Sequence, residues 1–154
     1  MDKAKKQEFT LRMSQANRTG LLVAIYDLFL EYMKDAKAAS DQAAFRDAVS
    51  NAQPVISELI SALDFKYQLS AELLNIYKYC NECLAKALRS RDYKDLEGAI
   101  ISIENIRAAF YEISLTDDSP ALMTNSEKVY AGMTYGRNDV NEVTGGSLNR
   151  GYLV

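Results

Sequence analysis

The sequence predicts an all-α fold: an antiparallel up-down helical bundle of four main helices, followed by a glycine-rich C-terminal tail. Apolar residues recur every three or four positions over four stretches between residues 17 and 115, which is the spacing of one face of an α-helix. The links between these stretches are short, and short links favour antiparallel neighbours. We therefore expect an N-terminal arm over residues 1–16, a bundle domain over residues 17–115 and an appendage over residues 116–154.

The first two helices of the bundle begin at residues that cap helices well. Asn17 can cap a helix with apolar positions over residues 21–36, because its side chain can accept a hydrogen bond from a free N–H of the first turn. Asp41 is placed in the same way before a second helix, apolar over residues 45–63. Pro54 lies inside that helix, and we expect a kink there rather than two separate helices.

The third and fourth helices are separated by a short turn. Ser70, with Glu72 nearby, can open the third helix, which should run to about Ser90. A turn at Arg91 and Asp92 follows, and Asp92 can cap the fourth helix. The four predicted helices would then enclose one core.

After Leu115 the composition changes. The tail holds five of the seven glycines and few large aliphatic residues. Ser119 and Pro120 can cap and begin a short fifth helix through Met123 or further. For the rest of the tail two interpretations stay open. It is a flexible appendage, or it folds back over the bundle and covers apolar surface with Tyr130, Met133, Tyr135 or Leu153.

The composition argues against several classes of function. A net charge of −3 offers no basic footprint for nucleic acid, and we interpret the lysines of residues 3–6 as a solvated, frayed N-terminus. No apolar run approaches the roughly 18 residues of a membrane span, and the polar start lacks the apolar centre of a signal peptide. Together with only two cysteines, this predicts a cytoplasmic protein without membrane insertion.

The sequence contains no histidine, which removes the usual general base and the commonest metal ligand. Cys80 and Cys83 have the spacing of a redox pair, but they lie in the middle of a predicted helix, where no helix N-terminus lowers a thiol pKa. We expect both thiols to pack in the core. The sequence therefore predicts no enzyme, no metal site and no cofactor.

The apolar stripes are wider than a closed bundle needs. Adjacent apolar pairs lie about 100° apart on a helix, beyond a narrow two-position seam. Three interpretations stay open for this surplus: core, dimer interface, or a groove for a partner helix. Tyr26 and Tyr77 suit either a surface that a partner covers or packing around the bundle. The pairs are Leu21-Leu22, Val55-Ile56, Leu59-Ile60, Leu73-Leu74 and Ile100-Ile101.

Four segments, in order and spacing, resemble the FliS family of flagellar export chaperones. Residues 13–27, MSQANRTGLLVAIYD, are similar to a family segment that leads through Ala-Ser-Pro into a helix ending Leu-Tyr-Asp. Residues 56–64 match its Ile-x-x-Leu-x-x-x-Leu-Asp run, and residues 72–87 its Leu-x-x-Leu-Tyr-x-Tyr helix. Residues 106–110, IRAAF, stand where the family has Leu-Arg-x-Ala-Trp. The resemblance covers residues 9–114.

The chain departs from the family pattern in three places. Asn17 and Arg18 stand where the family has Ser-Pro, no Gly-Gly precedes the third helix, and Phe110 replaces a tryptophan. The change at position 18 is physically mild, because arginine at the first helical position merely lacks the preset φ of proline.

The resemblance implies a non-enzymatic, cytoplasmic chaperone that binds the disordered C-terminal segment of flagellin in apolar grooves. Binding would prevent premature polymerisation and deliver the subunit to a component of the export gate. It also implies that the N-terminal arm can lie in part of the groove, a role that Phe9 and Met13 can fill. The alternative is a helical dimerisation or regulatory module, such as a homodimer, that does not bind flagellin. The expected partner-binding residues are Ile56, Leu59, Ile60, Leu63, Leu73, Leu74, Tyr77 and Leu84.

Overall fold

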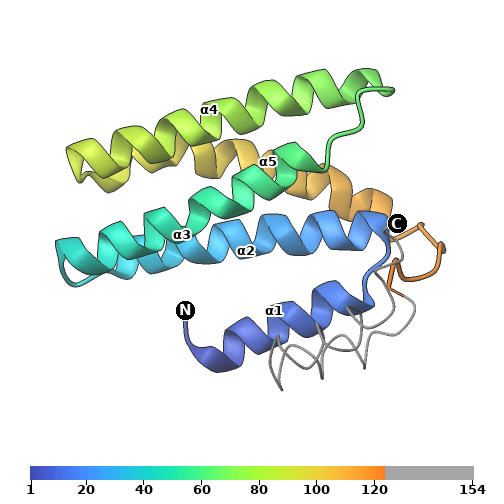
Figure 1. The fold of residues 1–154 in the computed structure, drawn as a ribbon, viewed down its shortest axis with the longest axis horizontal. Helices are drawn as coiled ribbons and strands as arrows, with labels where there is room; N and C mark the ends of the chain where they lie inside the picture. Colours follow the sequence, from blue (N-terminus) through green and yellow to red (C-terminus); the bar gives the residue numbers. More distant parts are fainter. Residues whose placement is uncertain (124–154) are drawn as a thin grey trace, which may run out of the picture.

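The computed structural model describes residues 1–123 as a bundle of four long helices with a further helix along its outside (Figure 1). Helix α2 packs against both α3 and α5, α4 closes the bundle between α3 and α5, and α1 packs on α2. No strand occurs among these residues, so the predicted all-α bundle is confirmed. The elements are α1 Lys3–Gln15, α2 Arg18–Ala38, α3 Gln42–Ser61, α4 Gln68–Ser90, the 3₁₀ helix η1 Tyr93–Leu96, and α5 Glu97–Ser114.

Two predicted helix caps are confirmed. The side chain of Asn17 accepts a hydrogen bond of 2.9 Å from the N–H of Gly20 at the start of α2. Asp41 accepts one of 2.8 Å from the N–H of Ala44 at the start of α3. Each bond satisfies an N–H that the first turn of a helix leaves without an intrahelical acceptor. Helix α3 continues through Pro54 as one element, as expected.

The predicted starts of the last two long helices need correction. Helix α4 begins at Gln68, and Ser70 does not cap it: its hydroxyl donates to the carbonyl of Asp64 at 2.6 Å. The preceding turn is already closed by a backbone bond from Tyr67 to Asp64, so the chain is turning before it reaches Ser70. Asp92 does cap, but it caps η1, which leads directly into α5.

The expected frayed N-terminus is wrong, because residues 3–15 form α1. Asp2 caps this helix by accepting a bond of 2.8 Å from the N–H of Lys5. Phe9 is buried, and two cations of α1 make ion pairs with α2. Docking on α2 therefore orders a segment whose own composition is largely polar.

The predicted short fifth helix does not form over residues 117–123. This segment instead makes hydrogen bonds to residues 16–19, at the junction of α1 and α2. The expectations for the rest of the tail, including Tyr130, Met133, Tyr135 and Leu153, lie outside the described residues.

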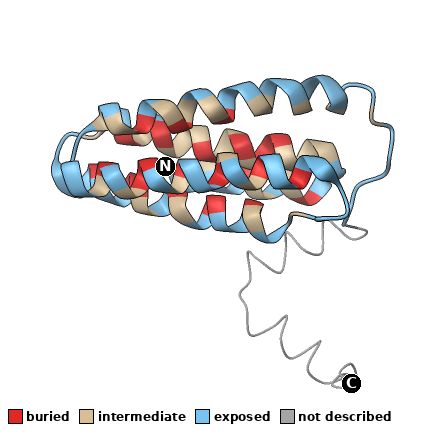
Figure 2. Cartoon of the chain, turned by 90° about the horizontal axis from the view of Figure 1, so that it is seen from above, coloured by how far each residue is buried: buried red, intermediate tan, exposed pale blue. Residues whose placement is uncertain are grey.

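The core lies between the inward faces of α2, α3, α4 and α5 (Figure 2). The buried hydroxyls of Tyr26 and Tyr77 meet across it at 2.6 Å, which joins α2 to α4. Burial raises the pKa of both tyrosines. Cys80 and Cys83 are also buried, as predicted, and burial raises the pKa of the Cys80 thiol to about 12. This thiol is therefore protonated at neutral pH and serves as a core side chain.

Candidate functional site: a groove covered by α1

A cavity of about 760 Å³ lies between α1 and the bundle, with walls from α1, α2, η1 and α5. Its lining combines nine charged side chains with six apolar or aromatic ones. A mixed lining of this kind suits a segment that presents one apolar face and one charged face. The apolar lining residues are Phe9, Leu30, Met33, Tyr93, Ile100 and Ala108.

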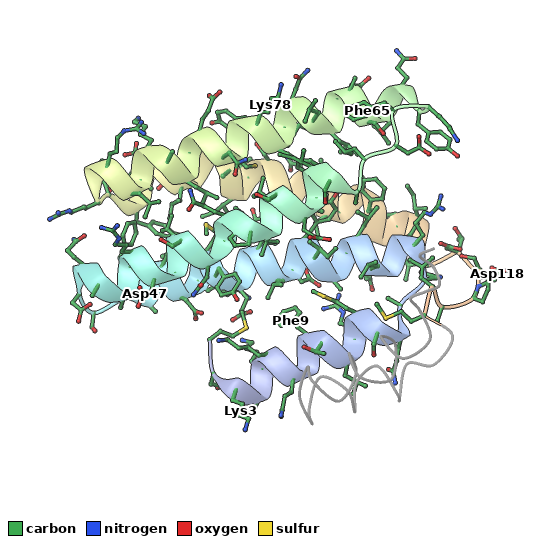
Figure 3. All side chains as sticks on the ribbon, viewed as in Figure 1. Lys3, Phe9, Asp47, Phe65, Lys78 and Asp118 are labelled. Atoms are coloured by element: carbon green, nitrogen blue, oxygen red, sulfur yellow. The ribbon has the colours of Figure 1, made fainter. Side chains whose placement is uncertain are left out.

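Phe9 is the apolar anchor of α1. It points from α1 toward α2, whereas Lys3 points away from the bundle (Figure 3). The Phe9 side chain is 9% exposed, and Met13, one turn further along α1, is half-buried. Buried Ser14 is the other closely packed residue of α1, and its hydroxyl donates back to the Leu11 carbonyl. Helix α1 thus buries one large apolar side chain, Phe9, where it packs on α2.

Asp27 on α2 binds two arginines from different helices. Arg12 of α1 donates to it at 2.6 Å, and Arg107 of α5 donates at 2.7 Å. Partial burial acts to raise the pKa of Asp27, but the hydrogen bonds from Arg107 and Arg12 outweigh it and hold the pKa below its ordinary value. Arg107 also lies over the ring of Tyr111, with its guanidinium carbon 5.1 Å from the ring centroid.

Glu31, one turn further along α2, repeats this arrangement. It pairs with Lys5 of α1, and with Lys34 of its own helix at 3.4 Å. The hydrogen bond from Lys5 is the main cause that lowers the pKa of Glu31. The carboxylate is largely covered, whereas Lys5 is half-buried and Lys34 is exposed.

Each carboxylate therefore has one cation from α1 and one cation from the bundle. If α1 leaves, Asp27 keeps Arg107 and Glu31 keeps Lys34. Removing one partner of a covered ion pair is expensive when it leaves the other charge without compensation. Here the bundle supplies that compensation itself, so the ion pairs to α1 can be exchanged.

The expected partner-binding residues lie on a different face from the expected arm residues. All eight belong to α3, α4 and the turn between them, whereas Phe9 and Met13 belong to α1, which packs on α2. Ile60, Leu63 and Leu74 are half-buried, and the first two pack against the core. The remaining five are buried in the bundle: Ile56, Leu59, Leu73, Tyr77 and Leu84.

Sequence reasoning missed the charged residues of the covered groove. Lys5, Phe9 and Arg12 are spaced by four and three positions, which places them on one face of a helix. That spacing was a usable signal for α1. The pairing of Asp27 with Arg107 had no local signal, because the two residues are 80 positions apart.

Residues 1–123 contain neither a membrane-spanning helix nor a cluster of metal ligands. No helix there is long and apolar enough to cross a membrane. No group of three or more Cys, Asp or Glu side chains in this part of the chain is arranged to hold a metal ion.

Fold and groove together define a helical bundle whose groove is covered by its own N-terminal helix. Residues 1–117 match the family described as flagellar protein FliS, and the chain belongs to this family. No curated protein matches the chain significantly. FliS proteins are cytoplasmic, non-enzymatic chaperones that bind flagellin, so family membership gives this protein a role in flagellar export.

Proposed function

We propose that the covered groove binds the disordered C-terminal segment of flagellin, and that α1 leaves the groove when flagellin enters. The observation that carries this proposal is the way in which α1 is held. One buried aromatic side chain and two exchangeable cations attach α1 to α2, and the N-terminal ammonium adds an ion pair with Asp35 at 2.6 Å. Asp27 and Glu31, the carboxylates beneath α1, each have a second cation from the bundle. An amphipathic segment that folds on binding can replace such a cover.

A cover of this kind reduces the apparent affinity of the groove. Flagellin binds only the fraction of molecules in which α1 is open, so the apparent dissociation constant rises as that fraction falls. The ordering of a disordered ligand reduces the affinity further. Both costs favour release of flagellin at the export gate, and a covered C-terminal segment of flagellin is unable to polymerise early.

We also propose that bound flagellin extends over the face formed by α3 and α4. Ile60, Leu63 and Leu74 are the predicted partner-binding residues accessible there. The other five support this face from the core: Ile56, Leu59, Leu73, Tyr77 and Leu84.

Calorimetric titration of the full-length protein with a peptide of the flagellin C-terminal segment tests the proposal. We expect one peptide per chain, a gain in helix by circular dichroism and a monomeric complex by light scattering. Amides of α1 should lose hydrogen-exchange protection in the complex. Absence of binding, together with a stable dimer of the chaperone, would support the dimerisation alternative instead.

A matched pair of variants tests the role of α1 in binding. Phe9→Ala weakens the cover, so it should tighten peptide binding several-fold. Ile101→Ala removes an apolar side chain of α5 that is 57% exposed, does not line the cavity and is not on the α3–α4 face, so it should leave the affinity unchanged. Weaker binding of Phe9→Ala would show that α1 takes part in ligand contact rather than competing with the ligand.

A further inference from the structure

The junction between α1 and α2 consists of only Ala16 and Asn17. Both are extended, with ψ angles of 147° at Ala16 and −176° at Asn17. If α1 moves away from α2 as an intact helix, the rotation has to occur at these two residues. The junction is therefore the hinge of the cover.

The segment that follows α5 is bound to both residues of this hinge. The N–H of Leu122 donates to the carbonyl of Ala16 at 3.0 Å. The side-chain amide of Asn17 donates to the carbonyls of Asp117 at 3.0 Å and Ser119 at 3.2 Å. These bonds join positions about 100 residues apart, since the sequence separations for Asn17 are 100 and 102.

Thr19 and Asp117 make a further hydrogen bond between the first turn of α2 and the loop after α5. The hydroxyl of Thr19 donates to the carboxylate of Asp117 at 2.6 Å. The other oxygen of this carboxylate accepts bonds from the N–H of Ser119, at 3.0 Å, and from its hydroxyl. Asp117 thereby orders its own loop and fixes that loop to the first turn of α2.

Asn17 is bonded from both sides of its amide. Its Oδ1 caps α2 through Gly20, while its Nδ2 donates to the loop after α5. A serine at this position, as in the related family segment, can cap the helix with its hydroxyl oxygen. Serine has a single donor proton and a shorter side chain than asparagine. It therefore lacks the two hydrogen bonds that the Asn17 amide makes to the loop.

We propose that residues 117–122 form a clasp that holds α1 closed over the groove by fixing the Ala16–Asn17 hinge. Rotation about φ of Asn17 turns the peptide plane between Ala16 and Asn17 and swings the Ala16 carbonyl away from Leu122, so opening of α1 about this bond breaks the clasp. The two ends of the FliS-matched region, residues 1–117, are thereby coupled. This inference rests on the proposed function insofar as it treats α1 as the cover of the groove.

Hydrogen exchange of the full-length protein tests the clasp without any ligand. Asn17→Ser keeps the helix cap but loses the two bonds to the loop, so α1 amides should exchange about tenfold faster. Amides in the middle of α4 should keep their protection. Asp41→Ser, a matched change at the cap of α3, should leave α1 exchange unaltered. Unaltered α1 exchange in Asn17→Ser would overturn the proposal, as would an equal acceleration in Asp41→Ser.

A second variant tests the clasp without changing any helix cap. Leu122→Pro removes the N–H that donates to Ala16, and it should also accelerate exchange of α1. Ala121→Pro removes a neighbouring amide that makes no hydrogen bond to another described residue, and it should have no such effect. Equal exchange in the two variants would contradict the clasp.

Peptide titration then separates the clasp from the proposed function. Tighter binding of the flagellin peptide to Asn17→Ser supports both the clasp and the proposed function. Faster α1 exchange without any peptide binding would support the clasp and overturn the proposed function. Peptide binding with unaltered α1 exchange would overturn the clasp alone.

Discussion

Helix α1 and the four-helix bundle are held together by different kinds of contact. The bundle encloses large side chains with no exposed surface, including Tyr26, Phe29 and Ile56. Phe9 is the one large apolar side chain of α1 that is buried; Met13 is half-buried, and Lys5 and Arg12 add ion pairs with α2. Ion pairs at a protein surface contribute about 0–1 kcal/mol each, whereas full burial of a large apolar side chain contributes about 1.5–3 kcal/mol. The bundle therefore holds most of the buried apolar surface, and in our proposal α1 is the part that opens.

The largest effect should come from a matched pair of phenylalanine truncations. Phe29→Ala removes a fully buried side chain of α2 and should lower the free energy of unfolding by about 3–5 kcal/mol. Phe9→Ala should lower it by no more than about 2 kcal/mol, because α1 opens locally before the bundle unfolds. Chemical denaturation followed by circular dichroism measures both. An equal loss in the two variants would show that α1 and the bundle unfold as one unit.

The second-largest effect on the free energy of unfolding should come from the tyrosine pair that joins α2 to α4. Tyr77→Phe leaves the hydroxyl of Tyr26 buried without its partner, which should cost about 1–3 kcal/mol. The double variant with Tyr26→Phe removes both hydroxyls, and it should recover most of this loss. Denaturation of the two single variants and the double variant gives the coupling energy. Additive losses would mean that the two hydroxyls do not depend on each other.

The smallest effect on stability should come from protonation of Asp117, in the loop that contacts the α1–α2 junction. Hydrogen bonds from Ser119 and Thr19 lower the pKa of this carboxyl to about 2. Because the folded-state pKa lies below the ordinary value of about 3.9, the contact stabilises the fold above that pH and is lost as the pH falls through about 2.

Carboxyl-carbon NMR shifts measure this titration directly. Thr19→Val should raise the pKa of Asp117, because the hydroxyl bond favours the charged form. Thr10→Val removes a hydroxyl that bonds within α1, so it serves as the control and should leave Asp117 unchanged. An unchanged pKa of Asp117 in Thr19→Val would show that the Thr19 hydroxyl does not bond to this carboxylate in solution.

Local bonds explain why much of the fold could be predicted from the sequence. Asn17 and Asp41 cap their helices through N–H groups three residues away, and the apolar spacing of each helix is equally local. The same reasoning failed at Ser70, because the preceding turn is closed by backbone bonds whatever side chain follows. It failed at α1 as well, because the composition of this helix is largely polar and its order depends on α2.

The sequence by itself determined the helical class, two of the caps, the absence of histidine chemistry and the resemblance to FliS. Only the tertiary structure decided which side chains meet. It brought Arg12 and Arg107 to the same carboxylate of Asp27. It also brought Tyr26 to Tyr77, and Asn17 to a loop 100 positions later. The periodicity of a helix shows which face is apolar. It does not show which other helix covers that face, because this depends on how the whole chain packs.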